Sequence, residues 1–420
     1  MQLPDEFLAQ TLAAMGEERF GRFLAAFDAE PPVSIRLNPA KIAGGSVPRV
    51  GTPVPWCPLG YYLASRPQFT FDPLLHAGCY YVQEAASMFV HHIVSELIRR
   101  PVLMLDLCAA PGGKSTALLS ALPEGSVLVS NEPVRQRAQV LVENIVKWGY
   151  DDSIVTCNYP RDYRQSGLFF DAMLCDVPCS GEGMFRKDPA SIGEWSLQNV
   201  ERCWQLQRQI VADAWQCLRP GGYMIYSTCT YNIKENEENV RWMCTELGAQ
   251  VVPVATEAEW GITGSLLEGF SEPVYRFIPG LTQSEGLFVC VLRKAGEADT
   301  AAPQRWDGRR LNVLYDGKPQ PVKRGKDVLP SHAEALKATF RPGRYPAAEV
   351  DYRQAIAYLR HESLTLPADT PRGMVVIMFG GRPLGFAKNI GNRANNLYPQ
   401  EWKIKSTHIP EDYETIFRPA

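Results

Sequence analysis

Two cysteines and an aspartate stand in short motifs that could carry covalent chemistry. Asp176 and Cys179 lie in DVPCSG, and Cys229 lies in STCT. Each motif follows an apolar run typical of a buried strand, so these side chains are expected at the carboxyl ends of strands. A single cysteine is more often an inert buried thiol. Two of them beside an acid favour a nucleophilic site.

A glycine-rich turn provides a second candidate site. In LDLCAAPGGKST a predicted buried strand ends and a helix begins, and a doubly wound sheet binds its ligands at this position. The small residues let the backbone approach a ligand closely. The candidate contacts are Cys108, Ala109, Ala110, Pro111, Gly112, Gly113 and Lys114. A structural turn that caps a helix is the alternative.

Three ligands compete for this turn. A dinucleotide would require GxGxxG, which the segment lacks. A nucleoside triphosphate would require GxxxxGKS or GxxxxGKT, but Cys108 replaces the first glycine of that motif. The adenosyl sulfonium S-adenosylmethionine carries no phosphate, so its binding does not require the glycine that the phosphate-binding motif would have at position 108. Glu132, at the end of the next predicted strand, is placed to bind ribose hydroxyls.

Cytosine chemistry would explain a thiol beside such a loop. Carbon 5 of cytosine is too weak a nucleophile to take a methyl group directly. A thiolate that adds to carbon 6 creates an enamine whose carbon 5 attacks the sulfonium methyl group. An acid such as Asp176 would hold N3 and the amino group of the base. The base must be unpaired or flipped out for this attack.

Alternating strands and helices are predicted to position these motifs. Continuous apolar runs predict buried strands at 102–107, 126–132, 153–158, 171–178 and 223–229. Apolar residues at helical spacing predict helices at 81–100, 134–148 and 197–218. This alternation predicts a parallel, doubly wound α/β sheet. The run at 286–294 has no long helix after it and is expected to be an antiparallel edge strand.

The composition excludes several classes of protein. With 45% hydrophobic and 21% charged residues over 420 positions, the chain is typical of a globular protein with more than one domain. The 11 cysteines include no CxxC pair, and no histidine falls between His92 and His332, so neither a disulfide scaffold nor a metal site is expected. The sequence shows no signal peptide and no run of roughly 20 apolar residues. We therefore expect a cytoplasmic protein without a membrane partner.

Charge is distributed unevenly along the chain. Residues 301–420 contain 19 Lys and Arg against 12 Asp and Glu, whereas residues 1–300 contain 24 against 34. A basic C-terminal part on an acidic body suggests that a polyanion docks at that end. A solvated basic surface is the alternative.

Changes of pattern divide the chain into four parts. A Pro-rich mixture of helix, short strands and turns predicts a small N-terminal subdomain at 1–79, followed by the α/β core at 80–294. The segment 295–308, which contains AGEADTAAPQ, predicts a linker. The remaining residues, 309–420, are expected to form an α+β or barrel-like region with a hairpin that turns at Gly380-Gly381.

Three motifs together resemble the Sun (Fmu) family of RNA cytosine-5 methyltransferases. They are CAAPGGK, DVPCSGEGMFRKDP and YSTCTYNIKENEENV, and the resemblance covers the core from Tyr80 to Lys294. It extends more weakly to SIRLNP and to LGFAKN with NNLYP. The resemblance implies a class I, Rossmann-like methyltransferase core that uses S-adenosylmethionine. The N-terminal subdomain and the C-terminal region are then expected to bind RNA.

The resemblance also implies roles for single residues. Cys229 would be the nucleophile, Cys179 would promote release of the methylated RNA, and Asp176 would lie between cofactor and base. The other implied cofactor contacts are Cys108 to Lys114 at the methionine end, Glu132 at the ribose, Arg137 nearby and Asn158 near the adenine. Asn158 departs from the pattern, because the family usually has an aspartate there.

The order of the parts is similar to the bacterial branch of the family that modifies small-subunit ribosomal RNA, in which the C-terminal module resembles a PUA barrel. The candidate phosphate contacts in this region are Arg382, Lys388, Arg393, Lys403 and Lys405. The hypothesis is therefore methylation of carbon 5 of cytosine in 16S ribosomal RNA. The same chemistry on transfer RNA, a P-loop NTPase and a non-catalytic RNA-binding protein are the alternatives.

Overall fold

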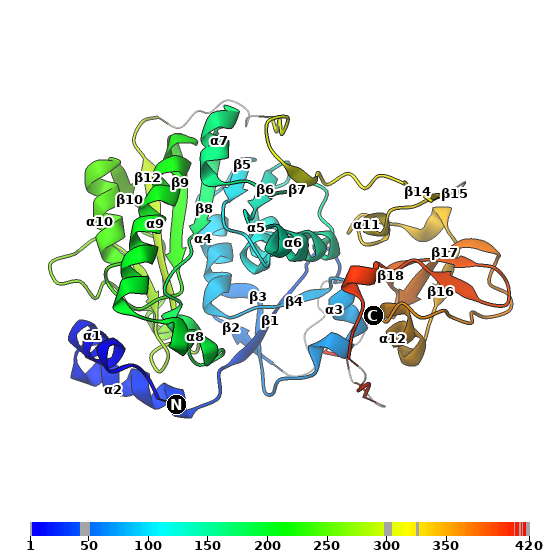
Figure 1. The fold of residues 1–420 in the computed structure, drawn as a ribbon, viewed down its shortest axis with the longest axis horizontal. Coiled ribbons are helices and arrows are strands. Elements are labelled where there is room, and N and C mark those ends of the chain that lie inside the picture. Colours follow the sequence, from blue (N-terminus) through cyan, green and yellow to red (C-terminus); the bar gives the residue numbers. More distant parts are fainter. Residues whose placement is uncertain are drawn as a thin grey trace.

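The computed structural model describes residues 2–42, 51–297, 305–324, 327–406, 408–410, 413, 415 and 416. Half of the predicted linker 295–308, namely residues 298–304, lies outside the described residues. An α/β core occupies one side of the molecule and a smaller C-terminal module occupies the other (Figure 1). The two are joined by N-terminal strands that run between them (Figure 1).

Five parallel strands form the centre of a nine-stranded sheet. They are β5 (Leu103–Asp106), β6 (Val127–Asn131), β7 (Ser153–Thr156), β8 (Phe170–Asp176) and β9 (Leu218–Thr228). In the sheet their order is β9-β8-β5-β6-β7, so the direction of winding reverses between β5 and β8. Ligands bind at such a reversal, beyond the carboxyl ends of the strands. The predicted parallel, doubly wound sheet is confirmed.

Helices cover both faces of this sheet. One face carries α4 (Phe89–Leu97), α5 (Gly113–Ala121) and α6 (Arg135–Trp148), and the other carries α7 (Pro160–Ser166), α9 (Leu197–Gln216) and α10 (Glu237–Glu246). The long helices α6 and α9 each bury one apolar stripe, as amphipathic helices do. Leu118 and Ile145 join the core cluster of the first face, and Ile210 and Met243 join that of the second.

The segment 81–100 differs from its prediction as one helix. Its first residues belong to β4 (Tyr80–Val82), which pairs with a strand of the N-terminal sheet. A single 3-10 turn, η3 (Ala86–Met88), leads into α4, which ends at Leu97. Pairing with a strand distant in sequence therefore overrides the helical spacing of the first residues.

The run 286–294 is antiparallel as predicted but does not lie at the edge of the sheet. It forms β12 (Leu287–Lys294), which pairs with β9 on one side. On its other side lie β10 (Ala249–Val251) and β11 (Tyr275–Phe277). These two strands have three residues each, too few for a periodic pattern to reveal.

The N-terminal part begins with helices that pack beside the ends of the core strands. Its elements are α1 (Asp5–Met15), α2 (Glu17–Ala25), η1 (Ala26–Asp28), β1 (Val33–Leu37), β2 (Thr52–Val54), β3 (Cys57–Leu63), η2 (Phe69–Phe71) and α3 (Pro73–His76). The strands form an antiparallel sheet of order β2-β3-β1-β4. Phe7 and Phe23 pack against Phe185 and Tyr231, so the helices support the segments that follow β8 and β9.

The C-terminal part starts on the core sheet and continues as a small α+β module. Its elements are β13 (Val313–Tyr315), β14 (Val322–Arg324), β15 (Asp327–Leu329), α11 (His332–Ala335), η6 (Pro342–Arg344), β16 (Ala347–Glu349), α12 (Tyr352–Leu359), β17 (Gly373–Phe379), β18 (Arg382–Asn389), β19 (Ala394–Asn396) and η7 (Gln400–Trp402). The predicted hairpin at Gly380 and Gly381 is confirmed, with φ of 55° and 69°. Such positive values suit a two-residue hairpin turn and favour glycine. The domain boundaries stay a prediction.

The C-terminal module packs firmly against the N-terminal segment. Ile35, Leu74 and Tyr80 share one apolar cluster with Ile356 and Val375. Deleting the module would expose this surface, so charge substitutions are the cleaner test of its role. Within the described ranges, no helix has the length and apolar character to cross a membrane. No cluster of three or more His, Cys, Asp or Glu side chains that could hold a metal ion occurs among those residues.

Candidate active site

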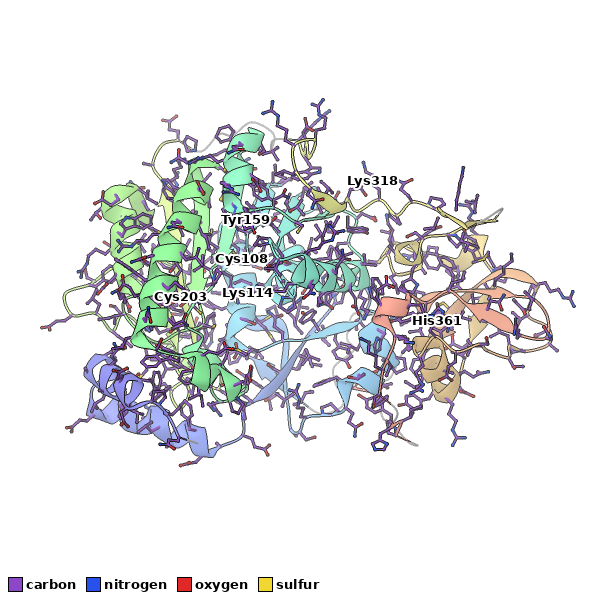
Figure 2. All side chains as sticks on the ribbon, viewed as in Figure 1. Cys108, Lys114, Tyr159, Cys203, Lys318 and His361 are labelled. Atoms are coloured by element: carbon purple, nitrogen blue, oxygen red, sulfur yellow. The ribbon has the colours of Figure 1, made fainter. Side chains whose placement is uncertain are left out.

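A cavity of about 420 Å³ opens at the carboxyl ends of β5, β8 and β9. The predicted site residues in its wall are Cys108, Ala109, Ala110, Pro111, Gly113, Lys114, Asp176 and Cys229. Cys108 and Lys114 lie in the middle of the core, between the two groups of helices (Figure 2). The glycine-rich turn and the nucleophile motif, which the sequence placed at the carboxyl ends of strands, therefore share one cavity.

The glycine-rich turn is shaped by its tight connection between β5 and α5. Gly112 has φ of 113°, in the left-handed region that favours glycine. A Cβ at this position would lie 3.2 Å from Leu141 Cδ1. The helix starts at Gly113, which places Lys114 in its first turn. Burial raises the pKa of Cys108 well above its ordinary value, so this residue lines the cavity as a neutral thiol.

Asp176 is held as a fixed hydrogen-bond acceptor between two neighbouring motifs. Lys114 Nζ donates to its Oδ2 over 2.8 Å, and Ser227 Oγ donates to its Oδ1 over 2.7 Å. Burial alone lowers the pKa of Lys114, but the charge and hydrogen bond of Asp176 raise it above its ordinary value. The pair is therefore a cation and a carboxylate in the wall of the cavity.

The two cysteines of the nucleophile motifs meet at this cavity. Cys179 Sγ and Cys229 Sγ lie 3.1 Å apart, and both thiols are free. Of the two, only Cys229 is among the described residues that line the cavity. The hydrogen bond with Cys229, followed by burial, raises the pKa of Cys179 well above its ordinary value. Cys179 therefore holds its proton at neutral pH.

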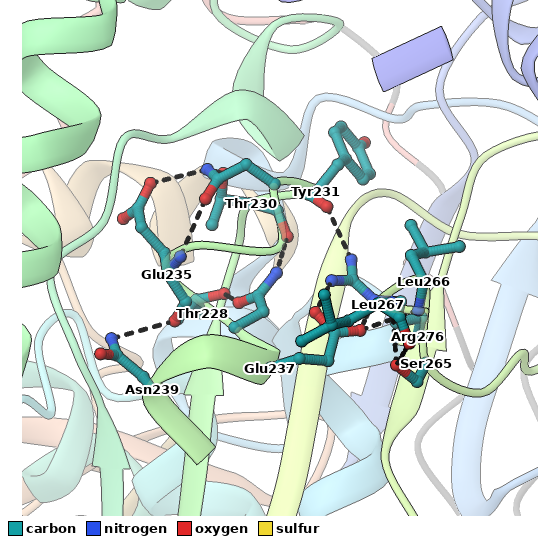
Figure 3. A network of polar contacts seen from close by, with 12 residues as sticks. Thr228, Thr230, Tyr231, Glu235, Glu237, Asn239, Ser265, Leu266, Leu267 and Arg276 are labelled. Atoms are coloured by element: carbon teal, nitrogen blue, oxygen red, sulfur yellow. Dashed lines mark hydrogen bonds and ion pairs between the residues drawn. The ribbon is translucent and has the colours of Figure 1, made fainter. Parts of the chain in front are cut away.

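The segment that follows Cys229 is fixed by buried polar contacts (Figure 3). Arg276 Nε donates to Glu237 Oε1 over 2.7 Å, and Arg276 Nη1 donates to Tyr231 O over 2.8 Å. Arg276 and Glu237 are both buried. An ion pair at this depth holds its segment in place because either charge alone would be costly to bury.

Asp106 presents an unsatisfied acceptor at the base of the cavity. Its Oδ2 accepts a hydrogen bond of 2.6 Å from Ser115 Oγ, whereas its buried Oδ1 has no donor among the residues that the structure describes. Burial raises the pKa of Asp106 to about 7, against the opposing effect of the Ser115 hydrogen bond. A buried polar atom without a partner is costly. A ligand with a donor or a positive charge would therefore fit here.

Glu132 pairs with Arg137, and Arg137 in turn contacts the backbone of the glycine-rich turn. Glu132 Oε1 accepts from Val134 N over 3.0 Å, and its Oε2 lies 3.2 Å from Arg137 Nη1. Arg137 Nη2 donates to Ala110 O over 3.1 Å. The described lining of the cavity includes neither side chain. Their predicted contacts with a cofactor stay a prediction.

Asn158 makes a contact that its position in the sequence does not suggest. Its Oδ1 accepts from Asn312 N over 2.9 Å, and its Nδ2 donates to Asn312 O over 3.3 Å. The amide thus ties β7 to the segment that enters β13. Asn158 does not line the described part of the cavity. A role near an adenine stays a prediction, and it would have to share the side chain with Asn312.

Several residues that line the cavity are missed by the sequence analysis. They are Tyr81, Val82, Gln83, Glu84, Ser87, Asp106, Gly183, Met184, Lys187, Glu285, Gly286 and Leu287. Asp106, Gly183, Met184 and Lys187 lie within the motifs quoted above but had no role assigned to them, and the others come from segments outside those motifs. Glu84 accepts hydrogen bonds from Ala86 N, Ser87 N and Glu285 N, each of 3.0 Å. An acid before a helical turn is a capping signal, which could have shown that the helix does not start at 81.

Three family models match successive parts of the chain. The N-terminal domain of 16S rRNA methyltransferase RsmF matches residues 3–85, and 16S rRNA methyltransferase RsmB/F matches residues 99–293. The methyltransferase RsmF PUA domain matches residues 345–404. The chain belongs to the RsmB/F family. This membership confirms an RNA methyltransferase rather than a P-loop NTPase or a non-catalytic protein.

Two relatives with the same name resemble 95% of the chain, and a solved structure resembles a smaller part of it. Ribosomal RNA small subunit methyltransferase F of Escherichia coli O139:H28 is 29% identical, over 95% of this chain and 96% of the relative. The protein of the same name from Cronobacter sakazakii is 28% identical over the same shares. NSun6 from Pyrococcus horikoshii has a TM-score of 0.58 and 21% identity, over 70% of this chain and 99% of that one. The solved structure supports the fold.

Proposed function

We propose that this protein methylates carbon 5 of a cytosine in 16S ribosomal RNA in the cytoplasm, with S-adenosylmethionine as methyl donor and Cys229 as nucleophile. The observation that carries the proposal is the pair of thiols 3.1 Å apart at a cavity that also contains the glycine-rich turn. Cys229, in the cavity wall, is the thiol that can reach a base. Cys179 does not belong to the described lining of the cavity, so it is the less accessible of the two thiols.

Each of these side chains has its own role in the proposed reaction. S-adenosylmethionine supplies a methyl group on a positively charged sulfur. The thiolate of Cys229 adds to carbon 6 of the flipped cytosine, which makes carbon 5 nucleophilic. The Asp176 carboxylate accepts from the amino group of the base, and from N3 once N3 takes up a proton as the adduct forms, and Lys114 keeps that carboxylate in place. After carbon 5 has taken the methyl group, a solvent water takes the proton from carbon 5 and the electron pair of that bond restores the 5,6 double bond. The electron pair of the bond between carbon 6 and sulfur returns to Cys229, and Cys179 assists this release by donating a proton to the Cys229 thiolate.

Asp106 gives a direct test of the donor site. Its unpartnered Oδ1 at the cavity wall fits the amino group of S-adenosylmethionine. We expect Asp106→Asn to weaken binding of S-adenosylhomocysteine by about 10- to 100-fold, because a hydrogen bond between charged groups contributes about 1.5–3 kcal/mol. Calorimetric titration measures this change. An unchanged dissociation constant would remove Asp106 from the donor site.

Ribosomal RNA is the proposed substrate because the matched family models and the relatives bear the names of 16S or small-subunit enzymes. Sequencing of 16S RNA by a method that detects 5-methylcytosine tests the whole proposal. Cells that lack the gene should lose the mark at one or more cytosines. Restored wild-type protein should return the mark, and Cys229→Ala protein should not. A mark that persists without the gene would refute the proposal.

The basic C-terminal module is proposed to hold RNA phosphates. Arg393, Lys403 and Lys405 are exposed on it. We expect the triple change of these residues to Gln to weaken RNA binding and to lower the slope of log affinity against log salt by about 0.7–0.9 for each lost contact. Binding of S-adenosylhomocysteine should not change. Filter binding at several salt concentrations measures the effect.

A matched triple variant controls for the loss of charge alone. Arg99, Arg161 and Arg202 are exposed on the core rather than on the module. Their change to Gln removes the same charge and should leave the salt slope close to that of the wild type. An equal loss of affinity in both variants would mean that the module has no special part in docking.

A further inference from the structure

Glu235 is a buried carboxylate that the proposed mechanism does not use. It has no exposed surface. Its Oε2 accepts hydrogen bonds from Ser180 N over 3.0 Å and from Gln207 Nε2 over 2.6 Å. Its Oε1 accepts from Asn232 Nδ2 over 2.8 Å. Three donors from three separate segments therefore converge on one side chain.

Two of these donors lie on the segments that carry the two cysteines. Ser180 directly follows Cys179, and Asn232 stands three residues after Cys229 on the segment shown in Figure 3. The same two segments are also joined by Ser180 Oγ and Thr230 Oγ1, 2.9 Å apart, and by Asn232 Nδ2, which donates to Ser180 Oγ over 3.4 Å. The carboxylate thus bridges the two segments that carry the sulfurs.

The third donor anchors this bridge to the body of the core. Gln207 lies on α9 and is fully buried, and its Nε2 also donates to Pro178 O over 2.9 Å. Its Oε1 accepts from Asn239 Nδ2 over 2.8 Å. Glu235 is therefore fixed against a long helix. The bridge sets the position of Cys179 relative to the sheet as well as to Cys229.

The three hydrogen bonds at position 235 require a side chain that only accepts. A carboxylate offers only acceptors, which matches three converging N–H groups. Glutamine would turn an NH₂ group toward at least one of these donors, so one hydrogen bond would be replaced by a repulsive contact. Aspartate is one methylene shorter. A distance between reacting groups that changes by about 1 Å can alter a rate by about 100-fold.

We propose that Glu235 is a positioning residue that keeps Cys179 beside Cys229 and thereby sets the rate at which methylated RNA leaves. The inference rests on the proposed function, in which Cys179 assists release. It goes beyond that function by naming the group that places the second thiol. Glu235 acts through Ser180 and Asn232 and does not contact the base.

The first experiment measures the covalent protein–RNA adduct that survives denaturation. Glu235→Gln should accumulate this adduct as Cys179→Ala does, with release slowed about 10- to 100-fold, while the dissociation constant for S-adenosylhomocysteine stays unchanged. Asp171→Asn is the matched control. Asp171 is also a buried acceptor, for Leu103 N over 2.9 Å, but it lies at the start of β8, away from the thiols. This control should lose stability without accumulating adduct.

The second experiment measures the geometry of the thiols without RNA. Diamide oxidises two neighbouring thiols to a disulfide and itself takes up their two electrons and two protons. In the wild type, a peptide that links Cys179 to Cys229 should form rapidly and be seen by mass spectrometry. In Glu235→Gln the linkage should form about tenfold more slowly or worse, and in Asp171→Asn at the wild-type rate.

These two readouts separate the two hypotheses. Wild-type rates of linkage and release in folded Glu235→Gln would overturn the positioning role. Slow linkage in Glu235→Gln with no adduct in Cys179→Ala would uphold the positioning role and refute the release function of Cys179. If Glu235→Gln does not fold, the same measurements are made on Asn232→Ala, which removes one of the three hydrogen-bond donors to Glu235. Slow linkage supports the role, and wild-type linkage overturns it.

Discussion

Replacement of Cys229 by alanine should abolish methyl transfer while the protein stays folded. Without this thiol no covalent bond to carbon 6 forms, so carbon 5 of the base remains too weak a nucleophile to take the methyl group. We expect the rate to fall by about 10⁵-fold or more, as it does when other enzymes lose their nucleophile. Transfer of a radioactive methyl group to 16S RNA measures the rate. The melting temperature shows that the fold persists.

The structure offers a matched control for this variant. Cys203 is a buried thiol on α9, outside the described lining of the cavity. Cys203→Ala removes the same atom and should keep nearly the full rate. Turnover by Cys229→Ala close to that of Cys203→Ala would show that the nucleophile is wrongly assigned. Binding of S-adenosylhomocysteine should be unchanged in both variants.

Replacement of Cys179 by alanine should trap the enzyme on its RNA. Cys179 Sγ lies 3.1 Å from the sulfur that forms the covalent bond, and its raised pKa keeps it protonated. A protonated thiol at this distance can return a proton to the departing Cys229 thiolate. Without it we expect one methyl group per enzyme to be transferred, followed by an adduct that persists in denaturing gels.

The size of this effect distinguishes a release role from a structural one. We expect the fraction of enzyme in the adduct to rise from a small share to the majority, with multiple turnover slowed about 100-fold. Cys179→Ser restores a proton donor of similar size and should release RNA faster than Cys179→Ala. Normal turnover by Cys179→Ala, with no adduct, would contradict the role.

The central strands could be predicted from the sequence because they lie in the middle of a parallel sheet. A strand of a parallel sheet is buried on both faces, so runs such as 102–107 and 171–178 are continuously apolar and easily seen. The hairpin at Gly380 and Gly381 was equally visible, because its turn requires positive φ at both positions. These signals are local, and each is carried by residues that are adjacent in the chain.

Elements held by distant partners were predicted less well. β4 (Tyr80–Val82) is a strand because it pairs with β1, and its own residues read as part of a helix. The strand Leu287–Lys294 is internal because β10 and β11 cover its outer side, and neither is long enough to show a period. In both cases pairing with strands distant in sequence determined the structure. A local sequence pattern carries no information about such partners.

The sequence by itself determined the family, the cofactor loop and the motif positions of Asp176, Cys179 and Cys229, since residue types and chain order suffice for these. The tertiary structure decided which side chains meet. It brought the two sulfurs within 3.1 Å, joined Lys114 to Asp176, and paired Asn158 with the backbone of Asn312. The reason is physical. Such contacts depend on the order of strands in the sheet and on the packing of loops beyond it, and both are set by burial across the whole core.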